Sequence, residues 1–166
     1  MNTKLLNQIT KIVSGGQTGA DRAALDFAIA NSIQYGGWCP KGGWAEDFPQ
    51  SPGIISKYPN LRETPRADPA QRTQWNVRDS SLTLILLNYS ELERSDGTVL
   101  TKQTADKLSK PSKVVDMSVE GVDVDTRRWL EENLGTGVLN IAGPRESESP
   151  NLYLSAKRFL GVLFGL

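Results

Sequence analysis

The sequence contains no histidine and only one cysteine among its 166 residues. Without histidine the chain has no imidazole general base and no Ser/His or Cys/His nucleophilic pair. It also lacks the side chain that most often binds zinc and haem iron. Cys39 cannot close a disulfide within the chain, and a single thiolate makes a poor site for a soft metal. We therefore expect neither zinc nor haem, and we expect Cys39 to pack as a small buried side chain.

Net charge and long apolar runs are also missing. The 19 basic and 19 acidic side chains give a formal charge of zero, which disfavours a broad electrostatic surface for nucleic acid or for a membrane. No run of about 18 apolar residues occurs, and the segment Met1–Gln8 lacks the apolar stretch of a signal peptide. These absences predict a cytoplasmic protein that binds neither nucleic acid nor membrane.

Short apolar runs alternate with helix-like stretches, a pattern typical of one α/β domain over residues 1–166 with a mainly parallel sheet. The clearest buried strand is 82–87, whose branched side chains form a nearly continuous run. About five strands and five helices are expected. The other strands are placed at 11–16, just before Trp38, at 113–117 and at 138–142. The helices are placed at 18–30, within 72–80, and at 98–108, 123–134 and 150–164, the last with Ser149 as its cap.

Residues 36–74 differ in composition from the rest of the chain. Six of the nine prolines fall there, together with several arginines and two of the four tryptophans. A connection of this length is usually functional or interfacial. Two interpretations remain: a surface loop packed by its own prolines and by Trp38, Trp44 and Trp75, or a pocket wall or subunit contact.

The segment Ser14–Arg22 is the strongest candidate for a binding loop. Gly15, Gly16 and Gly19 permit a sharp turn from strand to helix and leave backbone amides open to a ligand, and a helix N-terminus favours an anion. Thr18 and Asp21 resemble a capping box, which places the helix start near Thr18. The loop is neither a dinucleotide fingerprint nor a Walker A motif. The alternative is a tight turn without a ligand.

Two further turns follow predicted strands and reach the same sheet edge, since parallel strands place all their carboxyl-terminal loops together. Gly97 and Thr98 offer amides and a hydroxyl, unless they only cap a helix. Arg145 offers a fork of donors, unless it pairs with a neighbouring glutamate at the surface. Lys41 brings another cation to this edge. No carboxylate pair stands out as an acid/base couple, so the pattern favours an anion cradle without catalytic residues.

Several motifs in order resemble the molybdenum cofactor carrier-like proteins of the Lonely-guy-like Rossmann superfamily (SLOG). They are Gly15–Asp21, Gly37–Gly42, Arg72-Thr73, Asn76-Val77, Asp79-Ser80, Gly97-Thr98 with Thr101, and Ala142–Ser147. The resemblance implies a Rossmann-like, doubly wound α/β/α domain that self-associates and binds molybdenum cofactor, molybdate or a related anion. It places Gly15, Gly16, Gln17, Thr18 and Gly19 on the anionic end of the ligand and Gly97, Thr98 and Thr101 opposite, with Asp21, Arg22, Asn76, Asp79 and Ser80 as supporting residues.

Four hypotheses follow. The first is a non-catalytic carrier of molybdenum cofactor or molybdate, and the second a sensor of AMP-like or NAD-derived nucleotides in the same crevice. The third is a nucleoside-monophosphate phosphoribohydrolase that uses Glu46 or Asp79, although Thr101 stands where the enzymatic relatives carry a glutamate. The fourth is a self-assembling role. Exposed tryptophans of 36–74 and the apolar segment 159–164 predict a homo-oligomer, either a dimer or a tetramer.

Overall fold

The computed structural model describes residues 3–89 and 95–166; Met1 and Asn2, which open the N-terminal segment considered above, lie outside these ranges. The elements follow in the order α1 (Thr3–Gln8), β1 (Ile9–Val13), α2 (Ala20–Ala30), β2 (Tyr35–Cys39), the 3-10 helix η1 (Gly53–Ser56), β3 (Leu61–Glu63), α3 (Pro69–Arg78), β4 (Leu82–Leu87), α4 (Asp96–Lys107), β5 (Ser112–Asp116), α5 (Val122–Asn133), β6 (Gly137–Ala142) and α6 (Leu152–Phe164). No helix in the described part of the chain is long and apolar enough to cross a membrane.

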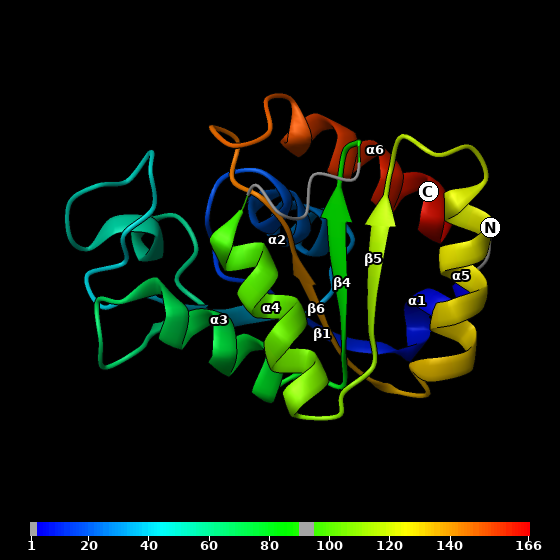
Figure 1. The fold of residues 1–166 in the computed structure, drawn as a ribbon, viewed down its shortest axis with the longest axis horizontal. Helices are drawn as coiled ribbons and strands as arrows, with labels where there is room; N and C mark the ends of the chain where they lie inside the picture. Colours follow the sequence, from blue (N-terminus) through cyan, green and yellow to red (C-terminus); the bar gives the residue numbers. More distant parts are fainter. Residues whose placement is uncertain (1–2, 90–94) are drawn as a thin grey trace.

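The strands form one parallel sheet in the order β3-β2-β1-β6-β4-β5. Helices α3 and α4 pack side by side on one face of the sheet, whereas α2, α5 and α6 cover the other (Figure 1). The Rossmann-like α/β/α architecture is therefore confirmed. Residues 3–89 and 95–166 contain one strand and one α-helix more than expected. The sequence pattern did not reveal β3, which has three residues inside the proline-rich segment, or α1, which is too short to show a clear period.

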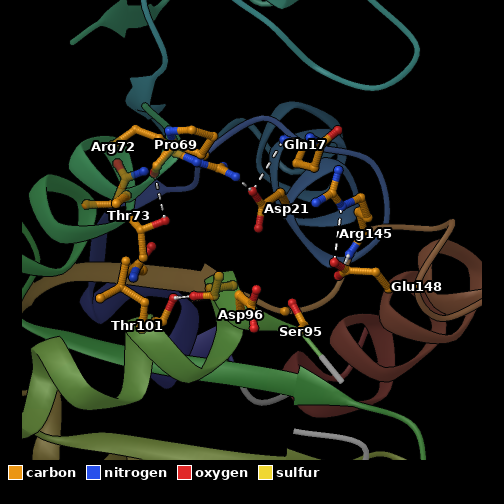
Figure 2. Close-up of a pocket in the computed structure, with 18 of the residues that line it drawn as sticks. Gln17, Asp21, Pro69, Arg72, Thr73, Ser95, Asp96, Thr101, Arg145 and Glu148 are labelled. Atoms are coloured by element: carbon orange, nitrogen blue, oxygen red, sulfur yellow. Dashed lines mark hydrogen bonds and ion pairs between the residues drawn. The ribbon is translucent and has the colours of Figure 1, made fainter. Parts of the chain in front are cut away.

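Because all the strands are parallel, the loops that follow β1, β4 and β6 reach one edge of the sheet. Figure 2 shows the result: Gln17 and Asp21 follow β1, Ser95 precedes α4, and Arg145 and Glu148 follow β6, all around one hollow. The winding of the chain reverses here, since β2 and β3 lie on one side of β1 while β4 and β5 lie beyond β6. Ligands of open α/β sheets bind at such a reversal.

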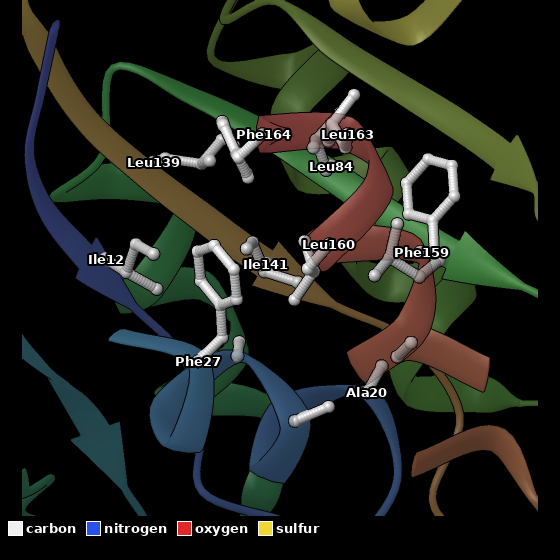
Figure 3. Close-up of a cluster of buried hydrophobic side chains, with 14 of the residues drawn as sticks. Ile12, Ala20, Phe27, Leu84, Leu139, Ile141, Phe159, Leu160, Leu163 and Phe164 are labelled. Atoms are coloured by element: carbon white, nitrogen blue, oxygen red, sulfur yellow. The ribbon is translucent and has the colours of Figure 1, made fainter. Parts of the chain in front are cut away.

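The main core lies between the sheet and helices α2, α5 and α6 (Figure 3). The rings of Phe27 and Phe164 are 5.4 Å apart between centroids, and Leu160 and Leu163 are fully buried beside them. The apolar segment 159–164 therefore belongs largely to the core of its own chain, so only a small part of it is left for the predicted subunit interface. Val162 is the side chain of this segment that stays exposed, at 56%.

Helix α6 begins two residues later than predicted, so Ser149 and Pro150 lie in the preceding turn. Asn151 occupies the N-cap in a left-handed conformation, with φ of 67°. The carboxylate of Glu146 reaches forward and accepts hydrogen bonds from the Asn151 and Tyr153 amides, at 2.6 and 2.9 Å. The Glu146 carboxylate, and not Ser149 as predicted, therefore accepts hydrogen bonds from the open amides at the start of α6.

Residues 36–74 fold into a small lobe with a core of its own. Cys39, Ile54, Tyr58 and Leu61 are buried there against Leu25 of α2. The burial of Cys39 confirms that prediction. The lobe also carries Trp44 and the segment Asp68–Thr73 to the sheet edge, where they line the hollow described below. Of the two interpretations of this segment, the pocket wall is the one that the structure supports.

Candidate functional site

A cavity of about 300 Å³ opens at the carboxyl-terminal edge of the sheet, between α3, α4 and the loops that follow β1 and β6. Its walls come from five parts of the chain: the glycine loop with the start of α2, Trp44 of the lobe, the first two turns of α3, the start of α4, and β6 with its loop. All three turns from which the sequence predicts an anion cradle contribute to these walls, and α3, which the resemblance marked through Arg72-Thr73 and Asn76, adds another.

Three helix N-termini meet at the cavity. Asp21 lies in the first turn of α2, Pro69 and Ala70 begin α3, and Asp96 and Gly97 begin α4, and all of them line the cavity. Each helix carries a partial positive charge at this end, and some of its first amides are already capped: the Ala70 amide of α3 donates to Asp68, and the Thr98 amide of α4 donates to Ser95. The three helices have 10 to 12 residues each, long enough for this effect to develop. The arrangement therefore favours an anionic group at the mouth of the cavity.

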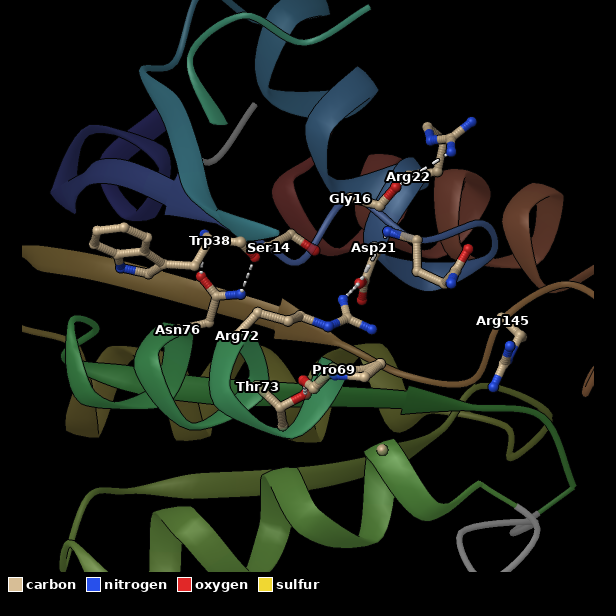
Figure 4. Close-up of polar contacts among 12 residues, drawn as sticks. Ser14, Gly16, Asp21, Arg22, Trp38, Pro69, Arg72, Thr73, Asn76 and Arg145 are labelled. Atoms are coloured by element: carbon tan, nitrogen blue, oxygen red, sulfur yellow. Dashed lines mark hydrogen bonds and ion pairs between the residues drawn. The ribbon is translucent and has the colours of Figure 1, made fainter. Parts of the chain in front are cut away.

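Arg72 on α3 forms an ion pair with Asp21 on α2 inside the cavity wall (Figure 4). The distance between Nη1 and Oδ2 is 3.0 Å, and the side chains are only 13% and 7% exposed. Burial raises the pKa of the Asp21 carboxyl and outweighs the opposing effect of Arg72 and of the Gln17 amide. The Nε of Arg72 is buried and has no hydrogen-bond partner among the described residues, so part of this guanidinium is still unsatisfied.

Arg145 and Glu148, from the loop after β6, form a second pair in the cavity wall, with 3.2 Å between Nε and Oε1. The guanidinium of Arg145 also lies over the Trp44 ring, 5.8 Å from its centroid. Both interpretations of Arg145 thus hold in part, since it reaches the crevice and pairs with a nearby glutamate. Each arginine of the cavity is paired with a carboxylate in this structure, and an anion entering the cavity competes for these two guanidinium groups.

The glycine loop adopts a tighter shape than the predicted capping box. Gly16 and Gly19 have φ of 77° and 78°, and helix α2 begins at Ala20 with Gly19 as a cap that makes no side-chain hydrogen bond. Helix α2 thus starts two residues after Thr18, close to the predicted position. The predicted capping box does not form, because the Asp21 carboxylate accepts from the Gln17 amide and from Arg72, and the Thr18 hydroxyl donates to Glu46. Gly15 and Gln17 face the cavity, whereas Gly16, Thr18 and Gly19 are not among its lining residues and shape the loop behind them.

Thr18 also joins the loops around the cavity to the lobe. Its hydroxyl donates to Glu46 and accepts from the Glu146 amide, and Glu46 further accepts from the amide and the hydroxyl of Ser147. Burial raises the pKa of the Glu46 carboxyl, but the hydrogen bonds from Ser147 and Thr18 outweigh it, so the pKa lies below its usual range. This network holds the lobe, the glycine loop and the loop after β6 in one arrangement.

The other predicted site residues divide into two groups. Gly97 and Thr101 of α4, Asn76 of α3 and Asp21 line the cavity. Thr98 does not: helix α4 begins at Asp96 rather than at Thr98, Ser95 is its cap, and the Thr98 hydroxyl donates to Ser95 Oγ at 2.8 Å. The interpretation of Thr98 as part of a helix cap is the one that the structure supports.

Lys41, Arg22, Asp79 and Ser80 lie away from the cavity. Lys41 is exposed on the lobe, where its amide donates to the Arg66 carbonyl at 3.0 Å, so the turn after β2 leads into the lobe instead of toward β1. Arg22 donates to both carboxylate oxygens of Asp47, at 2.8 and 2.9 Å. Asp79 is the C-cap of α3 and accepts from the Trp38 indole at 2.7 Å, and the Ser80 hydroxyl donates to the Val77 carbonyl at the end of the same helix.

The predicted ligand residues did not include Arg72, Thr73, Asn140 or Glu148, all of which line the cavity, although the motif Arg72-Thr73 belongs to the resemblance. A signal existed for Asn140, because it is the one strongly polar residue within the apolar strand 138–142. Arg72 carried no local signal as a partner of Asp21, since the two residues are 51 positions apart. Within residues 3–89 and 95–166 no group of three or more histidine, cysteine, aspartate or glutamate side chains has the arrangement of a metal site.

Comparison with known proteins adds two findings. Residues 12–164 match the model of the circularly permutated YpsA SLOG family. The chain is also similar to a solved structure, the putative molybdenum carrier protein of Syntrophus aciditrophicus, with 40% sequence identity, a TM-score of 0.82, and coverage of 95% of this chain and 96% of that one. None of the curated proteins matches the sequence.

The strand order matches a circular permutation of an ordinary doubly wound sheet. If the strands are numbered from β6, the order β3-β2-β1-β6-β4-β5 becomes 4-3-2-1-5-6. In that order the strands progress outward on both sides of the first strand, as in an ordinary doubly wound sheet. In this chain the unit β6–α6 comes last in sequence but occupies the central position of the sheet, between β1 and β4.

Proposed function

Since the chain belongs to the circularly permuted YpsA SLOG family, we propose that it is a non-catalytic carrier whose cavity binds molybdenum cofactor or a molybdate-type oxyanion. The name of the Syntrophus aciditrophicus protein, 40% identical over nearly the whole chain, supports this cargo. Molybdate and the terminal phosphate of the cofactor are both tetrahedral oxyanions, so amide, hydroxyl and guanidinium donors suit either group without a direct bond to the metal.

The observation that carries this proposal is the meeting of three helix N-termini and two arginines at one cavity. Gly97 leaves open space at its mouth, since an added Cβ there would meet no atom within 4 Å. Arg72 and Arg145 supply planar forks of donors that match the oxygens of an oxyanion. Binding exchanges the carboxylate partners of these arginines for the oxygens of the cargo, which favours reversible binding over very tight binding.

The positions of the two carboxylates considered for hydrolysis support a carrier rather than a phosphoribohydrolase. Glu46 and Asp79 are not among the residues that line the cavity. Glu46 is engaged by Thr18 and Ser147, and Asp79 by Arg78 and the Trp38 indole. A general acid or base must lie within hydrogen-bond reach of the group that it protonates or deprotonates.

Self-association as a dimer or tetramer remains part of the proposal. Leu154, Val162 and Leu166 on and after α6 are 53%, 56% and 55% exposed, and Trp44 of the lobe is 37% exposed. Exposed apolar side chains of this kind are enriched in the cores of homodimer interfaces. Sedimentation equilibrium gives the oligomeric state directly, and a monomer across the micromolar range would contradict this part of the proposal.

The proposal is tested by calorimetric titration with sodium molybdate and, anaerobically, with molybdopterin released from a molybdoenzyme. The variant Arg72→Met removes a cavity guanidinium, and Arg62→Met is the matched control because Arg62 lies on the exposed side of β3, outside the cavity. We expect saturable binding of at least one ligand, weakened about tenfold or more by Arg72→Met and unchanged by Arg62→Met. No saturable binding of either ligand would overturn the proposal.

A further inference from the structure

Charged side chains surround the cavity, and the acidic ones outnumber the basic ones. The described residues that line it include the basic side chains of Arg72 and Arg145 and the acidic side chains of Asp21, Asp68, Asp96 and Glu148. The guanidinium groups and the helix N-termini attract an anion to this place, whereas the carboxylates repel it. An anion therefore binds here most favourably if one of the carboxylates gives up its charge.

The four carboxylates differ in their exposure to water. Asp68 and Asp96 are exposed, so water and salt screen their charge. The Glu148 side chain, which pairs with Arg145, is 24% exposed, whereas that of Asp21 is only 7% exposed. Burial disfavours the charged form of a carboxyl group, because the protein replaces the water that stabilises the charge. Asp21 is therefore the carboxylate of the cavity whose charge is least solvated.

The charge on Asp21 depends on Arg72. Nη1 of Arg72 and the Gln17 amide both donate to Asp21 Oδ2, at 3.0 and 3.3 Å. Arg22, the next residue of α2, turns away and pairs with Asp47 of the lobe. Burial is the largest influence on the pKa of Asp21 and raises it, while the charge of Arg72 is the strongest influence that lowers it. If another anion engages Arg72, the Asp21 carboxylate loses its main counter-charge.

Arg72 is also a guanidinium for which an anion in the cavity competes. Its side chain lines the hollow and faces Asp21 (Figure 2), and its Nε is buried without a hydrogen-bond partner among the described residues. A guanidinium binds an oxyanion through two parallel N–H groups, so a bound anion draws Nη1 away from Asp21. Binding thus adds negative charge beside Asp21 and weakens its hydrogen bond. Two like charges in one buried site favour protonation of one of them.

We propose that the cavity binds its anion together with one proton, and that Asp21 takes up this proton from the solvent when the anion displaces it from Arg72. The charges balance: the carboxylate and the proton give a neutral carboxyl group, and Arg72 stays charged and exchanges one anionic partner for another. The neutral carboxyl has an O–H group to donate to an oxygen of the bound anion. This inference rests on the proposed function, and it applies to any oxyanion that reaches Arg72.

Proton uptake makes the affinity for the anion depend on pH. Between the pKa of Asp21 in the free protein and its higher pKa in the complex, each rise of one pH unit weakens binding about tenfold. Below both values Asp21 is neutral before and after binding, and the affinity is constant. A rise in pH therefore favours release of the anion, and Asp21 is the residue that sets the pH range of release.

The first test measures the proton itself. Wild-type protein is titrated calorimetrically with sodium molybdate and with sodium sulfate from pH 6 to 9, at each pH in several buffers that differ in their enthalpy of ionisation. The slope of the measured heat against that enthalpy gives the number of protons taken up. Both anions are fully deprotonated in this range, so the protein must supply the acceptor. We expect uptake that reaches about one proton per bound anion. Binding with zero uptake at every pH would overturn the inference.

Variants then identify the carboxyl group. Asp21→Asn keeps the size of the side chain without its charge, and we expect it to bind molybdate without proton uptake and with an affinity that is constant from pH 6 to 9. Glu148→Gln is the matched control, because it removes the carboxylate that pairs with the other arginine of the cavity, and it should retain the uptake. The opposite result, uptake lost in Glu148→Gln and kept in Asp21→Asn, would overturn the assignment. Circular dichroism melts check folding, and the wild-type titration needs no variant.

The results distinguish this inference from the proposed function. Saturable molybdate binding that depends on Arg72 but takes up no proton would overturn the role of Asp21 and still support a carrier. Proton uptake with sulfate, in a protein that does not bind molybdate, would support the role of Asp21 and count against molybdate as the cargo. If neither anion binds, the proposed binding of a molybdate-type oxyanion and this inference fail together.

Discussion

Arg72 and Asp21 stand 51 positions apart in the sequence, yet their side chains pair at 3.0 Å in the wall of the cavity. The pair joins α3 to the start of α2, and so links the lobe side of the cavity to the glycine loop. It is possible only because residue 15 is glycine, since a Cβ there would lie 1.8 Å from Arg72 Nη1. The same pair provides the guanidinium that an incoming anion would use.

Breaking this pair from one side should cost more than removing it entirely. Arg72→Met leaves the Asp21 carboxylate buried without a counter-charge, and we expect the free energy of unfolding at pH 7 to fall by about 3 kcal/mol. In an Asp21→Asn background the same change should cost about 1 kcal/mol or less, because no buried charge is stranded. Urea denaturation of the four proteins of this double-mutant cycle measures the coupling. Strictly additive effects would show that the pair is energetically irrelevant.

The raised pKa of Asp21 predicts a particular dependence of stability on pH. Burial raises the pKa of the folded-state carboxyl above its ordinary value, so between the two values the folded protein binds more protons than the unfolded chain. The contribution of Asp21 is therefore most favourable below its ordinary pKa of 3.8 and declines as the pH rises through the folded-state pKa. Asp21→Asn, which stays neutral, should gain stability relative to wild type as the pH rises from 4 to 7. Parallel pH profiles of the two proteins would contradict this expectation.

The pKa of the Asp47 carboxyl is shifted in the opposite direction to that of Asp21. A hydrogen bond from Arg22 holds its pKa below the ordinary value, so its contribution to stability is present above that value and is lost as the pH falls further. Asp47→Asn is therefore the control for the previous experiment. Its effect should stay constant from pH 5 to 7, whereas that of Asp21→Asn changes.

Glycine substitutions should separate binding from folding. In Gly15→Ala the new methyl meets side chains and not backbone, at 1.8 Å from Arg72 Nη1 and 2.8 Å from Asp21 Oδ2, so we expect weaker binding of molybdate and a loss of stability no larger than that of Arg72→Met. In Gly19→Ala the methyl lies 2.4 Å from the Pro144 carbonyl, at a residue with φ of 78°, and we expect a loss of about 2 kcal/mol or more. Chemical denaturation and calorimetric titration of both variants provide the comparison.

The control for the glycine series is Gly97→Ala. An added Cβ there meets no atom within 4 Å, and residue 97 lies within the first turn of α4. Alanine favours a helix over glycine, so stability should be unchanged or rise by up to about 1 kcal/mol. If Gly97→Ala lost as much stability as Gly19→Ala, the loss in Gly19→Ala would come from replacing a glycine of these loops. It would then not come from the close approach of the new methyl to the Pro144 carbonyl.

Cys39 should report the opening of the lobe. Its side chain is fully buried, its Sγ donates to the Arg62 carbonyl at 3.5 Å, and burial raises its pKa to about 11. At pH 8 the folded protein then holds almost no thiolate, so reaction with Ellman's reagent should be slow and should accelerate by orders of magnitude in urea. Fast reaction without denaturant would mean that the lobe opens independently of the main core.

The features that the sequence determined by itself are local ones. The continuous branched run Leu82–Leu87 matches β4 residue for residue, and the regular apolar spacing of 152–164 predicts the buried face of α6. Strands and amphipathic helices show their period within a few neighbouring residues, so no distant contact is needed to read them. The glycine loop is readable for the same reason, since its turn depends on backbone freedom at adjacent positions.

Only the tertiary structure decided which distant residues share the cavity. Lys41 and Arg72 are both cations of the segment 36–74, and they look alike in the sequence, but the lobe turns Lys41 outward while α3 brings Arg72 to Asp21. Asn140 stands out as a polar residue in its strand, but it lines the cavity only because β6 is inserted between β1 and β4, beneath α3 and α4. Pairing of this kind depends on the order of strands and the packing of layers, which are set by burial across the whole chain and leave no mark within any short segment.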